Sequence, residues 1–240
     1  KLVKDFFIDE VENNPRKILK NILMLTFGIQ IMGTLALFPA FHAEGVALPL
    51  FTAFFTSVSA FCNAGFSVFS DSLAQFTHNK AVSLIVMTLI FLGGIGFIVL
   101  KNLYQIVRKR KKYLSLHSKL ALLSSAVLIA GGALFYFFSE YSNSYSGMSL
   151  IDSIIASFFQ SITTRTAGFE TIAQPSQGPL SNVVTIFLMF IGGSPGSIAG
   201  GVKTTTFFIA FFYLLRGNEE KNNVSLFRRN ISSNAINKAI

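Results

Sequence analysis

Two short loops carry the residues whose types and spacing could do chemistry in this sequence. The first AGF loop (Ala-Gly-Phe) reads Asn63-Ala64-Gly65-Phe66, and the second AGF loop reads Thr166-Ala167-Gly168-Phe169. Each follows a short apolar, Phe-rich run, so its backbone carbonyls are expected at membrane depth without helix partners. Such carbonyls can replace the water around a dehydrated cation. The candidate cation ligands are Asn63, Ala64, Gly65, Thr166, Ala167 and Gly168.

A glycine-rich loop is the next candidate, and it interrupts the apolar segment 182–215. As one helix this segment would be about 51 Å long, well beyond a bilayer core of roughly 30 Å. Five glycines and Pro195 predict a break, and a simple kink is the alternative. The residues concerned are Gly192, Gly193, Ser194, Pro195, Gly196, Ser197, Ile198, Ala199, Gly200 and Gly201. Lys203 follows, and because a lysine in the bilayer costs about 3 kcal/mol, it should face water or a partner.

The composition indicates what kind of elements must position these loops. The chain has 240 residues, of which 51% are hydrophobic and only 13% are charged, and its mean hydropathy is +0.56. These values are typical of an all-α, multi-pass integral membrane protein and not of a soluble domain. One cysteine, Cys62, excludes an intrachain disulfide and a cysteine-based metal cluster.

The apolar segments repeat one arrangement twice: a spanning helix, a short helix, an AGF loop and a returning helix. A short helix of about 22 Å, as expected for 47–61, cannot cross a bilayer. We expect Asp152 and Ser153 to cap the second short helix. Matching Phe-Phe, Ser and Ala-Gly-Phe positions in the two copies indicate a parallel internal repeat. The expected helices are 18–38, 47–61 and 81–100 in the first copy, and 120–138, 152–164 and 182–215 in the second.

Charge placement predicts the topology. Lys and Arg gather in three clusters, at 1–20, 101–119 and 216–238, which the positive-inside rule makes cytoplasmic, together with both ends of this sequence. The net charge of +9 is therefore a topology signal and does not indicate nucleic-acid binding. Segments 39–46 and 140–150 are expected outside. The outer loops hold Glu44, Asp71, Glu140, Asp152 and Glu170, which predict an acidic vestibule that concentrates cations.

Enzymatic signatures are missing from the sequence. Gly196 and Gly201 have Walker-like spacing, but Val202 separates Gly201 from Lys203, so the phosphate-binding pattern fails. His42, His78 and His117 are scattered without metal-ligand spacing. We therefore expect no catalysis and no cofactor, only a transported ion.

These motifs together resemble the Trk/Ktr/HKT superfamily of potassium and sodium transport proteins, and most closely the Ktr-type bacterial membrane subunit. The features that carry the resemblance are "NAGF", "TTRTAGF" and "FIGGSPGSIAGGVKTTTF". The resemblance implies potassium-channel-like units of helix, pore helix, filter loop and helix, here the second (1–113) and third (114–240) of four. Because two loops cannot ring a pore, this sequence is expected to be either the middle of a longer chain, which we favour, or a two-unit protein of which two copies assemble.

The resemblance also implies a function in the cell membrane. It implies selective potassium uptake through a pore whose filter is the AGF loops and whose gate is the glycine-rich loop with Lys203. It implies a homodimer, opened by a cytoplasmic ring of nucleotide-binding regulatory subunits. Basic surfaces at 108–112 and 228–229 could dock that ring or contact membrane lipid.

Several alternatives stay open at the level of sequence. A sodium-selective or sodium-coupled secondary transporter also uses broken helices at the membrane midplane. A non-transporting membrane scaffold is the other alternative. Arg165 could neutralise the end of the second short helix or repel ions in a pore, and Phe66 and Phe169 are expected to pack behind the filter.

Overall fold

The computed structural model describes residues 15–109, 111–215, 225–226 and 229–230. Most of the described chain is helical, and its strands are one short antiparallel pair, β1 (Ser225–Leu226) and β2 (Arg229–Asn230). The basic clusters expected at 1–20 and 216–238 fall largely outside the described residues, as does Arg228 in the expected docking surface.

In the first half of the chain, the described residues form four helices and one short 3₁₀ turn. A long helix, α2, runs over Pro15–Ala43, and the short helix α3 follows at Pro49–Phe61, where Pro49 supplies a favourable first position. After the first AGF loop come η1 (Ala74–Phe76), α4 (Lys80–Gly94) and α5 (Phe97–Val107). The side chain of Asn79 caps α4 by accepting from the backbone of Val82.

The return segment of the first half differs from the prediction. We expected one unbroken span over 81–100, but α4 and α5 meet at a bend of 106°. The break occurs at Ile95 and Gly96, and Gly96 has φ of +88°. The bend has a physical reason. The break lies beside the glycine-rich loop, and that loop supplies hydrogen-bond partners for backbone groups that a continuous helix would pair internally.

The second half repeats the order of long and short helices. Helix α6 spans Leu116–Glu140 and α7 spans Leu150–Thr163, followed by η2 (Gln174–Ser176), α8 (Pro179–Phe190) and α9 (Thr204–Leu215). The expected cap of α7 is wrong. Ser149 is the N-cap and accepts from the backbone of Asp152, because α7 begins two residues earlier than expected.

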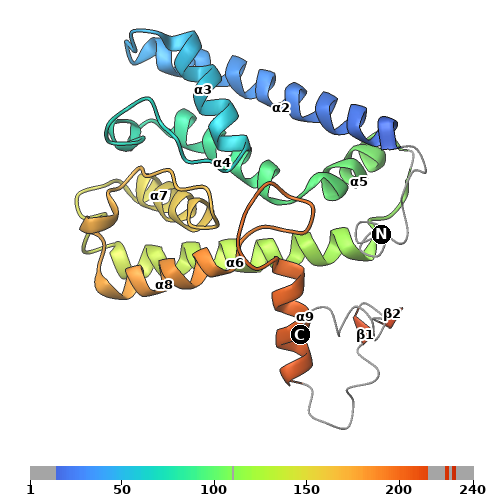
Figure 1. Ribbon diagram of the computed structural model, residues 1–240. Helices are drawn as coiled ribbons and strands as arrows, with labels where there is room; N and C mark the ends of the chain where they lie inside the picture. Colours follow the sequence, from blue (N-terminus) through green and yellow to red (C-terminus); the bar gives the residue numbers. More distant parts are fainter. Residues whose placement is uncertain (1–14, 110, 216–224, 227–228, 231–240) are drawn as a thin grey trace.

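Two of the described helices are long and apolar enough to cross a membrane, and the bent α4–α5 pair would be a third if it is counted as one span. Figure 1 shows α2 and α6 on opposite sides, with α4 and α7 between them. Helix α4 contacts α2, α3 and α7, so it joins the two halves. The main core cluster reflects this, since it combines Leu37, Phe41, Val86 and Ile90 of the first half with Phe159 and Phe169 of the second.

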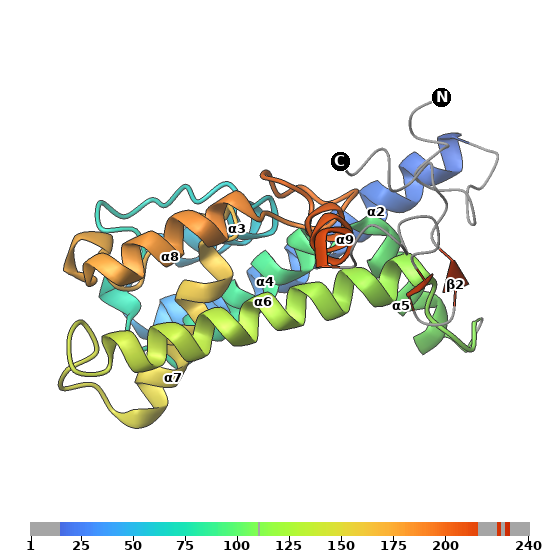
Figure 2. The same ribbon diagram turned by 90° about the horizontal axis from the view of Figure 1, so that it is seen from below.

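Apolar side chains also cover much of the outside. On α2 alone, Met24, Phe27, Met32 and Leu35 are each more than half exposed. Helix α9 runs away from α6 in Figure 1 and is seen nearly end-on in Figure 2, so the two helices are steeply crossed. A surface of this kind fits hydrocarbon contact and not water.

Candidate functional site

The first AGF loop begins directly after α3. Asn63 and Gly65 have positive φ, +48° and +72°, so the chain turns sharply here. The N–H of Ala64 donates to the Ser59 carbonyl at 2.9 Å, and the Ser59 hydroxyl donates to the Phe66 carbonyl at 2.8 Å. One residue of the last turn of α3 therefore holds both ends of the loop.

The second AGF loop is built in the same way. Thr166 and Gly168 have φ of +74° and +85°. The N–H of Ala167 donates to the Thr163 carbonyl at 2.9 Å, and the Thr163 hydroxyl donates to the Phe169 carbonyl at 2.7 Å. Thr163 thus occupies in α7 the place that Ser59 occupies in α3, although the sequence analysis did not single out either residue.

Each short helix is also fixed to its long helix through a serine. Ser57 donates to the carbonyl of Gln30 in α2 at 2.8 Å, and Ser161 donates to the carbonyl of Ile129 in α6 at 2.8 Å. Both serines are fully buried. The two bonds set the depth of each AGF loop relative to its long helix.

A glycine makes room for each of these serine bonds. A Cβ on Gly33 would overlap the Ser57 hydroxyl, and a Cβ on Gly132 would overlap the Ser161 hydroxyl. Sequence reasoning missed both glycines. The available signal was their spacing, because Gly33 and Gly132 each lie three residues after the carbonyl that accepts the serine bond.

The structure brings the two AGF loops together. A Cβ on Gly65 would overlap the carbonyl oxygen of Ala167 and would lie 3.2 Å from Cα of Gly168. Just after the two loops in the sequence, the N–H of Leu73 donates to the carbonyl of Glu170 at 2.9 Å. The candidate ligands of both halves therefore lie in one contiguous region, through their backbones.

The phenylalanines of the two loops differ. Phe169 is fully buried in the main core cluster, as expected, but Phe66 is 71% exposed, so its expected packing is wrong within the described chain. Phe169 shares this cluster with residues of the first half, such as Leu73.

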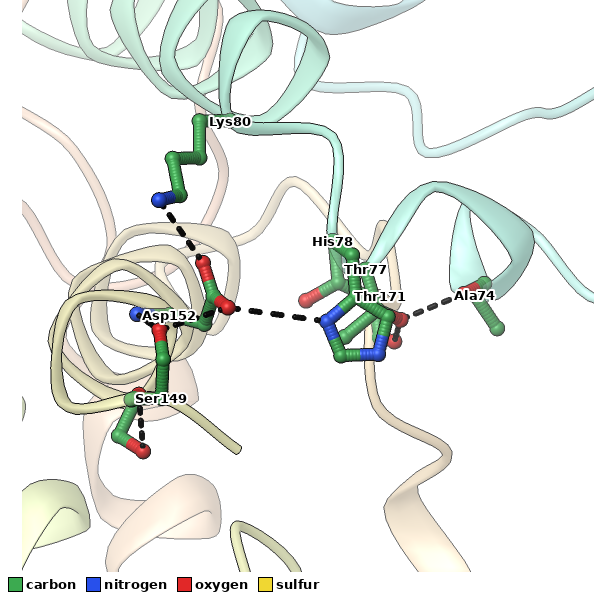
Figure 3. Close-up of polar contacts among 8 residues, drawn as sticks. Ala74, Thr77, His78, Lys80, Ser149, Asp152 and Thr171 are labelled. Atoms are coloured by element: carbon green, nitrogen blue, oxygen red, sulfur yellow. Dashed lines mark hydrogen bonds and ion pairs between the residues drawn. The ribbon is translucent and has the colours of Figure 1, made fainter. Parts of the chain in front are cut away.

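The predicted acidic vestibule is only partly available to cations. Asp152 Oδ1 lies 3.5 Å from Lys80 Nζ, and Asp152 Oδ2 lies 3.8 Å from His78 Nδ1 (Figure 3). The Ser149 hydroxyl donates to the same carboxylate, and this bond, assisted by the charge of Lys80, lowers the pKa of Asp152. Glu140 is fully buried and accepts from Asn143, Ser144 and Gly178. Both acids serve the fold.

Figure 3 also shows that the two halves are joined near this ion pair, where the Thr77 hydroxyl lies within hydrogen-bond distance of the carbonyls of Ala74 and Thr171. Asp152 comes from α7, whereas Lys80 begins α4. The contact therefore crosses between the halves just outside the AGF loops.

The glycine-rich loop leaves the helical path between α8 and α9. Its base is closed by a bridge between Ile191 and Val202, with Gly192 donating to the Val202 carbonyl at 3.1 Å. Lys203 donates from Nζ to the Ala199 carbonyl at 2.6 Å and is half-buried, so its partner is the loop itself.

The glycine-rich loop fills the break between α4 and α5. In a continuous helix the carbonyls of Gly93 and Gly94 would accept from residues 97 and 98. Instead Ile198 donates to Gly93 at 3.3 Å and Ser194 donates to Gly94 at 2.9 Å. The N–H of Phe97 in turn donates to the Gly196 carbonyl at 3.1 Å. This exchange satisfies the backbone groups that the bend frees.

The same loop contacts the second AGF loop. The N–H of Gly200 donates to the Thr166 hydroxyl at 3.0 Å. Arg165, which is 8% exposed, donates from one terminal guanidinium nitrogen to the Gly192 carbonyl at 3.0 Å and to the Ser125 hydroxyl at 3.3 Å. The structure thus brings the candidate gate residues against one of the two candidate ligand loops.

In the described part of the chain, no group of three or more His, Cys, Asp or Glu side chains could hold a metal ion. The available ligands near the AGF loops are backbone carbonyls and hydroxyls, which suit an alkali cation. The sequence matches the TrkH family, described as a cation transport protein, over residues 9–240.

The chain belongs to the TrkH family of cation transport proteins. It is 35% identical over 230 residues to the potassium/sodium uptake protein NtpJ of Enterococcus hirae, covering 93% of this chain and 50% of NtpJ. It is 34% identical over 247 residues to Ktr system potassium uptake protein B of Bacillus subtilis, covering 100% and 55%. These matches place it with the Ktr-type members of the superfamily, and the family's role is transport and not catalysis.

The fold has a match among solved structures. The crystal structure of the potassium transporter TrkH from Vibrio parahaemolyticus superposes with a TM-score of 0.77 at 21% identity, covering 94% of this chain and 48% of TrkH. The chain spans about half the length of these relatives. Its mostly helical fold is therefore that of a TrkH-like membrane protein.

Proposed function

We propose that this chain supplies two of the pore-forming units of a potassium uptake protein. The observation that carries this proposal is the meeting of the two AGF loops at Gly65 and Ala167, each loop held by a hydroxyl of a short helix. A helix that ends inside the membrane directs the negative end of its dipole at this region, which favours a cation. The ion ligands are backbone groups of 63–65 and 166–168.

The two units are 1–113 and 114–240. Features that both halves share support this division. In each half a serine of the short helix donates to a carbonyl of the long helix, and a hydroxyl of the short helix donates to the carbonyl of the loop phenylalanine. Equivalent positions of the two AGF loops also have positive φ. The loop between α5 and α6 contains the boundary. Two such units do not close a ring alone, so further units complete the pore.

The glycine-rich loop, 192–201, with Lys203, is the gate in this proposal. It is attached to the second AGF loop at Gly200 and to the α4–α5 break at Gly94. A loop held by a few backbone bonds can change between two positions when a partner prefers one by a few kcal/mol. The partner is a cytoplasmic ring of nucleotide-binding regulatory subunits, and the membrane subunit acts as a homodimer.

The proposed location is the cell membrane, with the basic segment 101–119 and both ends of this sequence cytoplasmic. The run 108–112, which the structure describes except for residue 110, follows α5 and carries the densest positive charge of the sequence. Anionic lipid and an acidic partner surface would both be attracted there. The AGF loops then lie toward the outer side.

Sodium transport is the second candidate, favoured by one observation: a relative at 35% identity is named a potassium/sodium uptake protein. Measurement of potassium and sodium flux through the full-length protein in liposomes tests both candidate functions. We expect potassium flux that is reversible and needs no sodium gradient. Potassium movement only with a sodium gradient would support a coupled transporter, and no cation flux at all would support a scaffold and contradict the proposal.

A further inference from the structure

Arg165 and Thr166 hold the two ends of the glycine-rich loop. Arg165 donates to the carbonyl of Gly192, where the loop begins, and Thr166 accepts from the N–H of Gly200, near its end. These are consecutive residues, and Thr166 has φ of +74° inside the second AGF loop. The second AGF loop and the glycine-rich loop are therefore joined at two points by the side chains of two adjacent residues.

The chemistry of Arg165 is unusual for a structural residue. Its side chain is buried, its Nε has no partner, and within the described residues no carboxylate pairs with it. Burying an unpaired charge is costly, and a neutral donor could make the same bonds at a lower cost. The guanidinium does, however, present several donors in a fixed plane, so it can bond Gly192 and Ser125 together.

We propose that Arg165 is a positioning residue that latches the glycine-rich loop against the second AGF loop, with Thr166 as the second point of the latch. This inference rests on the proposed function and names the contact that keeps the gate loop in its docked position. In the docked position Ala199 is 3% exposed. Release of the latch should expose this residue.

A cysteine at Ala199 reports the position of the loop. In the full-length protein with Cys62→Ser, the rate at which a small thiol reagent modifies Ala199→Cys measures how often the loop leaves its docked position. We expect Arg165→Met to raise that rate about tenfold, the factor given by 1.4 kcal/mol. Arg165→Lys keeps a charged donor and should restore slow modification in part.

Two substitutions of Thr166 form a matched pair, because one removes the side-chain hydroxyl and the other keeps it. Thr166→Ala removes the hydroxyl that accepts from Gly200, whereas Thr166→Ser keeps it at the same backbone conformation. We expect faster modification of Ala199→Cys with Thr166→Ala and a rate close to the reference with Thr166→Ser. If Arg165→Met fails to assemble, the comparison of Thr166→Ala with Thr166→Ser still tests the latch.

Two results would overturn the latch. One is an unchanged modification rate in Arg165→Met, and the other is an equal rate in Thr166→Ala and Thr166→Ser. The reporter works whether or not the protein conducts potassium. Absence of cation flux in the unmodified protein would therefore contradict the proposed function. An unchanged modification rate of Ala199→Cys in a protein that conducts potassium would contradict the latch alone.

Discussion

Gly65 lies so close to Ala167 that a Cβ on the glycine would overlap the carbonyl oxygen of the alanine. The two residues come from different halves of the chain, and they belong to loops of nearly the same build. The region between the halves is therefore shaped by backbone atoms, as carbonyl ligation of a cation requires.

Gly132 and Gly131 provide a test of the serine anchors. A Cβ at 132 would overlap the Ser161 hydroxyl and lie 3.0 Å from Leu188, whereas a Cβ at 131 has no neighbour within 4 Å. We expect Gly132→Ala to destabilise the full-length protein by about 1–3 kcal/mol through overpacking. Gly131→Ala, which only raises helix propensity, should be neutral or stabilising. Thermal unfolding in detergent compares them, and equal midpoints would contradict the anchor.

Asp152 should contribute stability that depends on pH. Its folded-state pKa is lowered, so the ionised carboxylate stabilises the fold above the ordinary Asp value of about 3.9 and loses this effect as the pH falls through the lowered pKa. We expect Asp152→Asn to lower the unfolding midpoint at pH 7. The difference from the unmodified protein should shrink toward pH 3.

The control for this measurement is Asp71→Asn, an exposed acid in the loop after the first AGF loop. It should change the midpoint little at either pH. A midpoint difference for Asp152→Asn that is equally large at pH 3 and pH 7 would show that the effect comes from packing and not from charge.

The proposed topology predicts which side of the membrane each loop faces. In a Cys62→Ser background, a cysteine at the exposed Lys112 should react with a membrane-impermeant maleimide only after the cells are opened. A cysteine at the exposed Ser146, between α6 and α7, should react in intact cells. Labelling of the Lys112 position from outside would reverse the assignment.

Shortening the glycine-rich loop should weaken its role as a gate. Deletion of 197–200 removes the bonds from Ile198 to Gly93 and from Gly200 to Thr166. We expect several-fold higher potassium flux without the regulatory partner, and unchanged preference for potassium over sodium, because the AGF loops are intact. A deleted protein that still needs the partner for any flux would identify the segment as a kink.

Much of the arrangement could be predicted because local patterns determine it. Short apolar runs before an Ala-Gly-Phe sequence predict two short helices, and α3 and α7 confirm both, with ends within a few residues of those expected. A helix of 182–215 was too long for a bilayer, and the chain is indeed non-helical between α8 and α9. Length and composition were sufficient for these conclusions.

The break between α4 and α5 was not predictable in the same way. The sequence around Gly93, Gly94 and Gly96 continues an apolar pattern that is typical of one span. What decides the bend is the glycine-rich loop, which lies far away in the sequence and supplies Ser194, Gly196 and Ile198 as substitute partners. Tertiary hydrogen bonds of this kind have no periodic signature in the sequence.

The most direct test of the account is the potassium-to-sodium selectivity of Gly65→Ala, compared with Ala64→Ser and Gly168→Ala in the full-length protein. A Cβ at 65 would overlap the Ala167 carbonyl, whereas a Cβ at 168 would lie 3.9 Å from Cα of Gly65, although both glycines have positive φ. We predict that Gly65→Ala loses most potassium selectivity, that Gly168→Ala loses less, and that Ala64→Ser retains it. Unchanged selectivity and uptake in Gly65→Ala would contradict the assignment of the AGF loops as the ion-binding site.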